Sequence, residues 1–147
     1  LKMWNAADIP VLLATMRRHP RRLHDQLRRL GLDRAFWRVV VCTSGRGGRA
    51  KALAVRRALP DSGRVAFWCG DTEDDVHAAR SLGCRIWTVS CGLRDIRSLK
   101  RLRPDGIARD LLSAARRAGT IPKRTAIVRY EIKPCDRDIS PATSDEK

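Results

Sequence analysis

The sequence predicts an α/β fold: a Rossmann-like parallel sheet with helices on both faces. Two observations predict it. Short apolar runs alternate along the chain with segments whose apolar residues recur at helical spacing. Gly or Pro lies at the ends of several of these segments. Such alternation indicates βαβ units, whose right-handed crossovers place helices on both faces of the sheet. The 147 residues suit one domain, and 43% hydrophobic residues are enough for a core.

The first half of the chain gives two strand–helix pairs. The apolar run Pro10 to Thr15 predicts a buried strand, and a helix follows from Pro20 until Gly31 closes it. Arg38 to Cys42 predicts a second strand. Ala50 to Leu59 predicts a second helix, which Pro60 stops. The positions expected to face inward are Leu23, Leu27 and Leu30 in the first helix and Leu53, Val55, Ala58 and Leu59 in the second.

The second half repeats the alternation. Arg64 to Cys69 predicts a third strand, and Glu73 to Leu82 predicts a helix that ends at Gly83. Cys84 to Ser90 predicts a fourth strand, and Ile107 to Ala118 a final helix. The positions expected to face inward are Val76, Ala79 and Leu82 in the third helix and Ile107, Leu111, Leu112, Ala115 and Ala118 in the last.

The character of the sequence changes after Gly119. We therefore expect residues 1–119 to form the α/β core, and residues 120–147 to add an edge strand and a tail. Thr125 to Ile132 suits the edge strand. Pro134 to Lys147 has two prolines, several small polar residues and mixed charge, a composition that predicts disorder.

The composition argues against a membrane or secreted protein. No apolar run approaches the roughly 20 residues of a membrane span, and no secretory pattern opens the chain. The five cysteines form no Cys-x-x-Cys pair, and their odd number suits reduced thiols in a reducing compartment, so we expect a cytoplasmic protein. These cysteines are Cys42, Cys69, Cys84, Cys91 and Cys135.

The net charge of +15 raises the alternative of a basic nucleic-acid-associated protein. Two features argue against that alternative. The basic residues are 25 Arg and 6 Lys spread along the whole chain, a diffuse arginine bias that genome composition can produce. Aromatic residues make up only 5%, so no platform for stacking bases is evident.

An acidic cluster stands out in this basic chain. The segment Gly70-Asp71-Thr72-Glu73-Asp74-Asp75 lies at the junction between a predicted strand and a predicted helix. Clustered carboxylates repel one another and favour a counter-ion, and Mg²⁺ often uses one or two carboxylates. Helix capping is the alternative, because Thr72 and Asp75 have the spacing of a capping box. Capping alone does not require Gly70 or Asp71.

Three polar segments follow predicted strands: Thr15, the Gly-rich stretch Thr43 to Arg49, and Asp71 to Asp75. Ligands of open parallel sheets bind beyond the carboxyl ends of the strands, where all three segments should meet. The Gly-rich stretch lacks the Lys-Ser/Thr ending of a nucleotide-binding loop, so we interpret it as a turn whose amides could approach a phosphate.

This order of segments resembles the haloacid-dehalogenase-like hydrolase superfamily, which is made up mostly of Mg²⁺-dependent phosphatases. The second motif of that family is a Thr or Ser after an apolar strand, as in Val11 to Thr15. Its third is a Lys near a helix start, as in Gly48 to Lys51. Its fourth is Gly-Asp-x-x-x-Asp after a strand, which Gly70 to Asp75 matches in full. The resemblance covers roughly residues 5 to 115.

The resemblance implies a role for each of four residues. Thr15 would hydrogen-bond a phosphoryl oxygen, and Lys51 would supply positive charge to the phosphate and to the nucleophile. Asp71 would ligate Mg²⁺, and Asp75 would ligate it, orient a metal-bound water or fix Lys51. The implied substrate is a small phosphorylated compound. Plainer alternatives stay open: Thr15 ending a strand, Lys51 solvated at a helix start, and Asp75 only capping its helix.

The first motif of the family is the departure. It is an Asp-x-Asp whose first Asp forms an aspartyl-phosphate, and only Asp8 stands among the fourteen residues before Thr15. The other Asp-x-Asp, Asp136-Arg137-Asp138, follows no clean apolar strand and would require a permuted arrangement. With its Leu1-Lys2-Met3 start, the chain is expected to be the downstream part of such an enzyme. The alternative is a non-catalytic binding module or a decayed fragment. Oligomeric state stays open.

Overall fold

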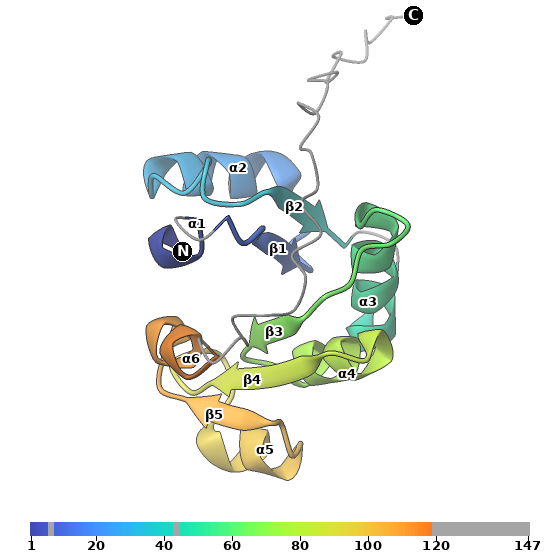
Figure 1. Cartoon of the computed structure of the whole chain (residues 1–147), viewed down its shortest axis with the longest axis vertical. Coiled ribbons are helices and arrows are strands. Elements are labelled where there is room, and N and C mark those ends of the chain that lie inside the picture. The colour runs from blue at the N-terminus through green and yellow to red at the C-terminus, as the bar shows by residue number, and fades with distance from the viewer. Residues whose placement is uncertain (6–7, 43–44, 119–147) are drawn as a thin grey trace, which may run out of the picture.

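The computed structural model describes residues 1–5, 8–42 and 45–118 (Figure 1). Strands and helices alternate through most of this range, as the sequence predicts. The strands are β1 (Leu12–Thr15), β2 (Arg38–Val41), β3 (Phe67–Gly70), β4 (Arg85–Val89) and β5 (Gly106–Ala108). The helices are α1 (Lys2–Asn5), α2 (Pro20–Arg29), α3 (Gly47–Ala58), α4 (Glu73–Leu82), α5 (Ile96–Arg101) and α6 (Leu111–Ala118).

Every described strand pairing is parallel. β1 pairs with β2, with Leu12 opposite Arg38 and Thr15 opposite Val41. β4 lies between β3 and β5, with Trp68 of β3 opposite Ile86 of β4. The predicted α/β fold with a parallel sheet is therefore confirmed. Within the described residues, β1 pairs only with β2 and β3 only with β4, so each has one edge without a strand neighbour there.

A hydrophobic cluster joins the two sets of strands. Val55 of α3 and Val76 of α4 have no exposed surface, and they pack with Trp68 of β3 and Ile86 of β4. Leu12 and Ala14 of β1 pack against the same cluster. In Figure 1, α3 and α4 lie next to each other beside the strands. β1 and β3 are thus held to one core, although within the described residues the two strands do not pair.

The helices α3 and α4 approach closely at Gly48. A Cβ atom added there would lie 2.4 Å from the Cβ of His77 and 2.7 Å from the backbone oxygen of Asp74. Contacts this short with backbone atoms leave no room for any side chain. This explains why α3 begins at Gly47, three residues before the predicted start: the Gly residues belong to its first turn.

The last predicted helix was wrong in its first third. Ile107 lies in the short strand β5, and the helix α6 begins only at Leu111. The Oδ1 of Asp110 accepts the backbone N–H of Ser113 at 2.7 Å and so fixes the start of α6. The helix α5 was not predicted, although Asp95 caps it by accepting the backbone N–H groups of Arg97 and Ser98.

Four residues predicted to face inward are exposed: Leu30, Leu53, Leu111 and Leu112. In α3 the buried face passes through Ala52 and Val55, so Leu53 points to solvent. In α6 the small residues Ala114 and Ala115 are buried instead of the leucines. A helix that packs closely favours small side chains at the contact. The spacing of leucines alone therefore does not reveal which face of the helix is buried.

The predicted edge strand Thr125 to Ile132, the tail from Pro134 and the motif at Asp136 all lie outside the described residues. The boundary after residue 119 stays a prediction. Among the described helices, none has both the length and the apolar character that a membrane crossing requires.

Gly48→Ala tests the close contact of α3 and α4. Helix propensity alone would make this change stabilising by up to about 1 kcal/mol. We expect destabilisation by about 1–3 kcal/mol, because the added methyl group meets backbone atoms of α4 that cannot move independently. Urea denaturation measures the change. Leu53→Ala, at an exposed position of the same helix, is the control and should change stability little. A more stable Gly48→Ala chain would contradict the contact.

Candidate active site

The carboxylate of Asp75 connects three elements of the structure. Its Oδ1 accepts a hydrogen bond from Lys51 Nζ of α3 at 2.6 Å and one from Trp68 Nε1 of β3 at 3.0 Å. Its Oδ2 accepts the Thr72 hydroxyl at 2.7 Å and the backbone N–H groups of Asp71 and Thr72, both at 3.2 Å. Asp75 is thus the common acceptor for groups from α3, β3 and the start of α4.

Both members of the Lys51–Asp75 pair are buried. Lys51 is 7% exposed and Asp75 is 4% exposed. The ammonium also lies 5.6 Å from the ring centroid of Trp68, a distance at which the face of an indole attracts a cation. A buried charge is stable only when it is paired and hydrogen-bonded. The two residues therefore depend on each other.

The local sequence explains this geometry. Gly70 ends β3 where a Cβ atom would lie 2.2 Å from Cγ of Asp75, so only glycine lets the carboxylate reach the strand end. Thr72 is the N-cap residue of α4, and the Asp75 side chain accepts its backbone N–H, as the predicted capping box requires. The capping interpretation of Asp75 is confirmed, but the same side chain also holds Lys51.

Opposing effects set the pKa of Asp75. Burial alone would raise it, but the charge of Lys51 and hydrogen bonds from Lys51, Thr72 and Trp68 together hold the pKa below its usual value. The carboxylate is therefore ionised at neutral pH and balances the charge of the ammonium.

Asp71 is held differently from Asp75. It follows β3 directly, and its Oδ2 accepts the backbone N–H of Leu93 at 2.7 Å. Its Oδ1 has no hydrogen-bond partner within the described part of the chain. A hard cation such as Mg²⁺ takes a carboxylate oxygen of this kind and completes its coordination with waters and substrate oxygens. Asp71 therefore fits a magnesium ligand.

Asp75 fits a direct metal ligand less well. A carboxylate has about four acceptor positions, and five donors already contact this one. Of the predicted roles for Asp75, the geometry favours fixing Lys51. The described residues contain no group of three or more His, Cys, Asp or Glu side chains that could hold a metal by themselves. A cation bound at Asp71 would need oxygens from water or substrate.

Thr15 lies at the end of β1, where its hydroxyl oxygen accepts the backbone N–H of Arg17 at 3.3 Å. No hydrogen bond joins Thr15 to Lys51 or Asp71 among the described residues. The backbone N–H of Cys42 donates to the Thr15 carbonyl at 2.7 Å, and the charges of Lys51 and Asp75 act on the Cys42 thiol. Thr15 thus stays near the site but outside its hydrogen-bond network.

The cysteine thiols near the site are poor nucleophiles. Burial raises the pKa of Cys42, and it raises the pKa of Cys69 to about 12, with the charge of Asp75 adding to the effect. A thiol at neutral pH under these conditions stays protonated and unreactive. The described cysteines are all free; Cys42 is buried, whereas Cys91 is exposed.

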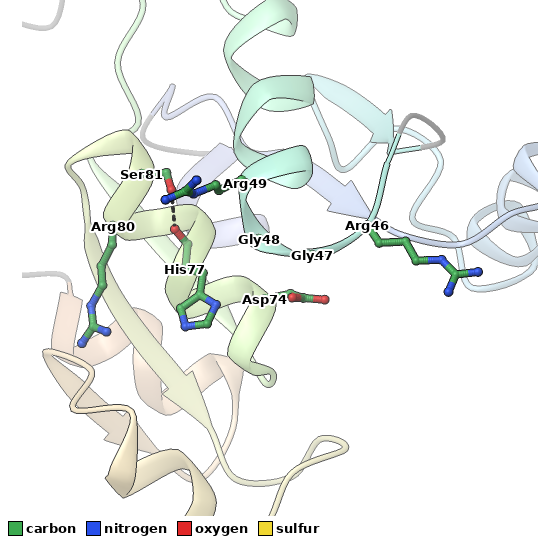
Figure 2. A pocket seen from close by; sticks show the side chains of 8 residues that line it. All are labelled: Arg46, Gly47, Gly48, Arg49, Asp74, His77, Arg80 and Ser81. Carbon is green, nitrogen blue, oxygen red and sulfur yellow. Dashed lines mark hydrogen bonds between the residues drawn. The ribbon is translucent and has the colours of Figure 1, made fainter.

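An open cleft lies on another side of α4 (Figure 2). Residues from the start of α3 and from one face of α4 line it, and none of the four predicted site residues does. Figure 2 shows the side chains of Arg46 and Arg80 pointing away from each other across it. The lining residues are Arg46, Gly47, Gly48, Arg49, Asp74, His77, Arg80 and Ser81. Asp74 thus belongs to the acidic cluster in sequence but to this cleft in space.

Sequence reasoning missed two groups of the site. Trp68 was not among the predicted site residues; its ring is buried, and its indole N–H donates to Asp75. A buried Trp beside a Gly-Asp strand end is a signal that could have suggested this, because buried indoles need an acceptor. The Leu93 backbone N–H has no such signal in the sequence.

Comparisons with known proteins support the fold. No protein-family model and no curated protein matches the chain by sequence. Solved structures do match. A protein from Clostridium difficile assigned as a phosphatase superposes with a TM-score of 0.65 at 18% identity, over 78% of this chain and 55% of that one. A haloacid-dehalogenase-like hydrolase from Streptococcus pneumoniae gives 0.63 at 21% identity, with the same coverage. The chain has the haloacid-dehalogenase-like fold.

The fold does not by itself specify the reaction. A protein from Thermotoga maritima assigned as a beta-phosphoglucomutase also superposes, with a TM-score of 0.56 at 25% identity over 73% of this chain and 51% of that one. The chain spans about half the length of these haloacid-dehalogenase-like structures. Function must therefore be argued from the residues of the site.

Asp75→Asn tests the buried ion pair. We expect the free energy of unfolding at pH 7 to fall by about 3–5 kcal/mol, because Lys51 would remain buried without a counter-charge. Urea denaturation measures this. The matched control is Asp25→Asn, which removes the exposed pair of Asp25 with Arg28 and should leave stability almost unchanged. Equal effects of the two substitutions would show that burial of the pair contributes nothing.

The stability lost in Asp75→Asn should depend on pH. Because the pKa of Asp75 is lowered in the folded chain, its stabilisation is fully present above the unfolded value of about 4 and is lost as pH falls through the folded pKa. We therefore expect the stability difference between the natural chain and Asp75→Asn to shrink on acidification below about pH 4. Denaturation curves at pH 7 and pH 3 measure it. A difference that stays constant would contradict the lowered pKa.

Proposed function

We propose that this chain carries the metal- and phosphate-binding groups of a magnesium-dependent phosphatase that hydrolyses a small phosphate monoester through an aspartyl-phosphate. The carrying observation is the buried Lys51–Asp75 pair beside Asp71 at the carboxyl end of β3. Such a pair is costly to bury and seldom contributes net stability, so a role in holding an ammonium group for a ligand accounts for its presence.

Each residue has a defined task in this proposal. Asp75 fixes the Lys51 side chain by one short hydrogen bond, and the remaining N–H donors of the ammonium are available to phosphate oxygens. Thr15, at the end of β1, donates its hydroxyl to a phosphoryl oxygen, since that hydroxyl uses only its oxygen as acceptor toward Arg17. Asp71 presents Oδ1 to the cation. Bound Mg²⁺ would neutralise phosphate charge and keep the phosphoryl group aligned for attack.

The proposal assigns no nucleophile to residues 1–147. In the haloacid-dehalogenase-like family the nucleophilic Asp ends a strand ahead of the Thr motif, and in this sequence Asp8 is the one aspartate ahead of Thr15. Asp8 follows no strand within the described residues. A binding module that takes up Mg²⁺ and a phosphorylated ligand without turning it over stays a second candidate.

Asp71→Asn tests the proposal. We expect Mg²⁺-dependent hydrolysis of a generic phosphate monoester by the natural protein to fall at least 100-fold, because the amide is neutral and binds a hard cation poorly. Asp74→Asn is the matched control, since Asp74 is two residues into α4 and lines the separate cleft. It should retain activity. Undiminished turnover in Asp71→Asn would refute the assignment, whereas Mg²⁺ binding without any turnover by the natural protein would establish the binding module.

A further inference from the structure

The loop between β4 and α5 holds the carboxylate of Asp71. The backbone N–H of Leu93 donates to Oδ2 of Asp71 at 2.7 Å, while Oδ1 has no partner within the described residues. The Leu93 side chain itself is 81% exposed, so packing of that side chain does not hold the loop here. The contact to Asp71 is made by backbone, and it occupies one of the two carboxylate oxygens.

Gly92 allows this approach. A Cβ atom at residue 92 would lie 2.2 Å from both Cβ and Oδ2 of Asp71. A contact to Cβ cannot be relieved by rotating the end of the Asp side chain, because Cβ is fixed by the backbone. Glycine is therefore the residue that lets the loop reach Asp71 at all.

The loop is fastened on both sides of Leu93. On one side the backbone N–H of Cys91 donates to the Arg109 carbonyl at 3.1 Å. On the other side Arg94 makes a two-pronged contact with Glu73 in the first turn of α4, with Nε donating to Oε2 at 2.7 Å and Nη2 donating to Oε1. That hydrogen bond lowers the pKa of Glu73 to about 2, so the pair is ionised at neutral pH.

We propose that residues 91–95, the clamp loop, are a positioning element for the metal ligand Asp71. Leu93 fixes one oxygen so that the other faces outward, and the Arg94–Glu73 pair keeps the Leu93 N–H in place. This inference rests on the proposed function, because it assumes that Asp71 binds Mg²⁺. Arg94 and Gly92 act only through Asp71 and so are positioning residues.

The direction in which Mg²⁺ affinity changes when Arg94 is replaced distinguishes a positioning role from a purely electrostatic one. Arg94 is a cation whose pKa is raised first by its hydrogen bond with Glu73 and also by the charges of Asp71 and Asp74. Coulomb repulsion alone says that removing this positive charge should tighten Mg²⁺ binding. A positioning role predicts weaker Mg²⁺ binding instead, because the loop and its N–H donor would be released from Asp71.

The experiment measures the affinity of the full chain for Mg²⁺ alone by titration calorimetry at pH 7. We expect Arg94→Ala and Gly92→Ala each to weaken binding about tenfold, the usual effect of losing a group that orients a metal ligand. Arg101→Ala is the matched control: it removes an arginine near the same loop that, among the described residues, forms no hydrogen bond or ion pair with Glu73. It should leave affinity unchanged or slightly tighter. Because Arg94 is on the surface, its variant is expected to fold.

A metal-free measurement accompanies the titration. Hydrogen exchange of the Leu93 amide, followed by NMR without Mg²⁺, should be slow in the natural chain and several-fold faster in Arg94→Ala, as in Asp71→Ala, which removes the acceptor. Equal Mg²⁺ affinity in the natural chain, Arg94→Ala and Gly92→Ala would overturn the clamp loop and leave the proposed function standing. Absence of Mg²⁺ binding by the natural chain would overturn the proposed metal role, and the positioning of a ligand with it, whatever the Leu93 exchange rate.

Discussion

The hydrogen bond from Lys51 to Asp75 is the interaction on which the other features of the site depend. It brings the start of α3 against the strand end of β3 and the first turn of α4. Neither charge can be left in the interior without the other, so the three elements are fixed relative to one another at this point. Trp68, which contacts the pair, belongs to the hydrophobic cluster with Val55 of α3 and Val76 of α4, and this cluster packs the two helices together.

Apolar packing and polar chemistry meet in single residues here. The ring of Trp68 is part of the core cluster, yet its N–H ends on Asp75 and its face lies beside the Lys51 ammonium. Cys42, directly after β2, is buried and donates its backbone N–H to the Thr15 carbonyl, and the charges of Lys51 and Asp75 act on its thiol. The hydrophobic cluster holds the two sets of strands together, and the charged pair lies close enough to influence both.

The sequence predicted the fold class and the helix Glu73–Leu82 to the residue, because Thr72, Asp75 and Gly83 are local signals that bind backbone groups at its ends. It failed at Ile107, where a three-residue strand and a helix were joined into one apolar pattern. It failed at Leu53 and Leu112, because smaller residues occupy the buried faces of α3 and α6 and these leucines point to solvent. For the site, Lys51 and Asp75 were proposed together only through a family resemblance, and the Leu93 N–H is a tertiary contact of a backbone group that any residue type could supply.

Asp71 and Asp75, four residues apart in one motif, differ in the number of hydrogen bonds that they accept. Asp75 accepts five hydrogen bonds, which exhausts the roughly four acceptor positions of a carboxylate. It is therefore saturated by protein groups and acts by holding them. Asp71 accepts one from the described residues, and that one comes from a loop drawn close by the absence of a side chain at Gly92. A carboxylate that is oriented but mostly unsatisfied at the end of a strand suits an external cation. The number of hydrogen bonds that each aspartate accepts therefore supports the two different roles that we propose for them.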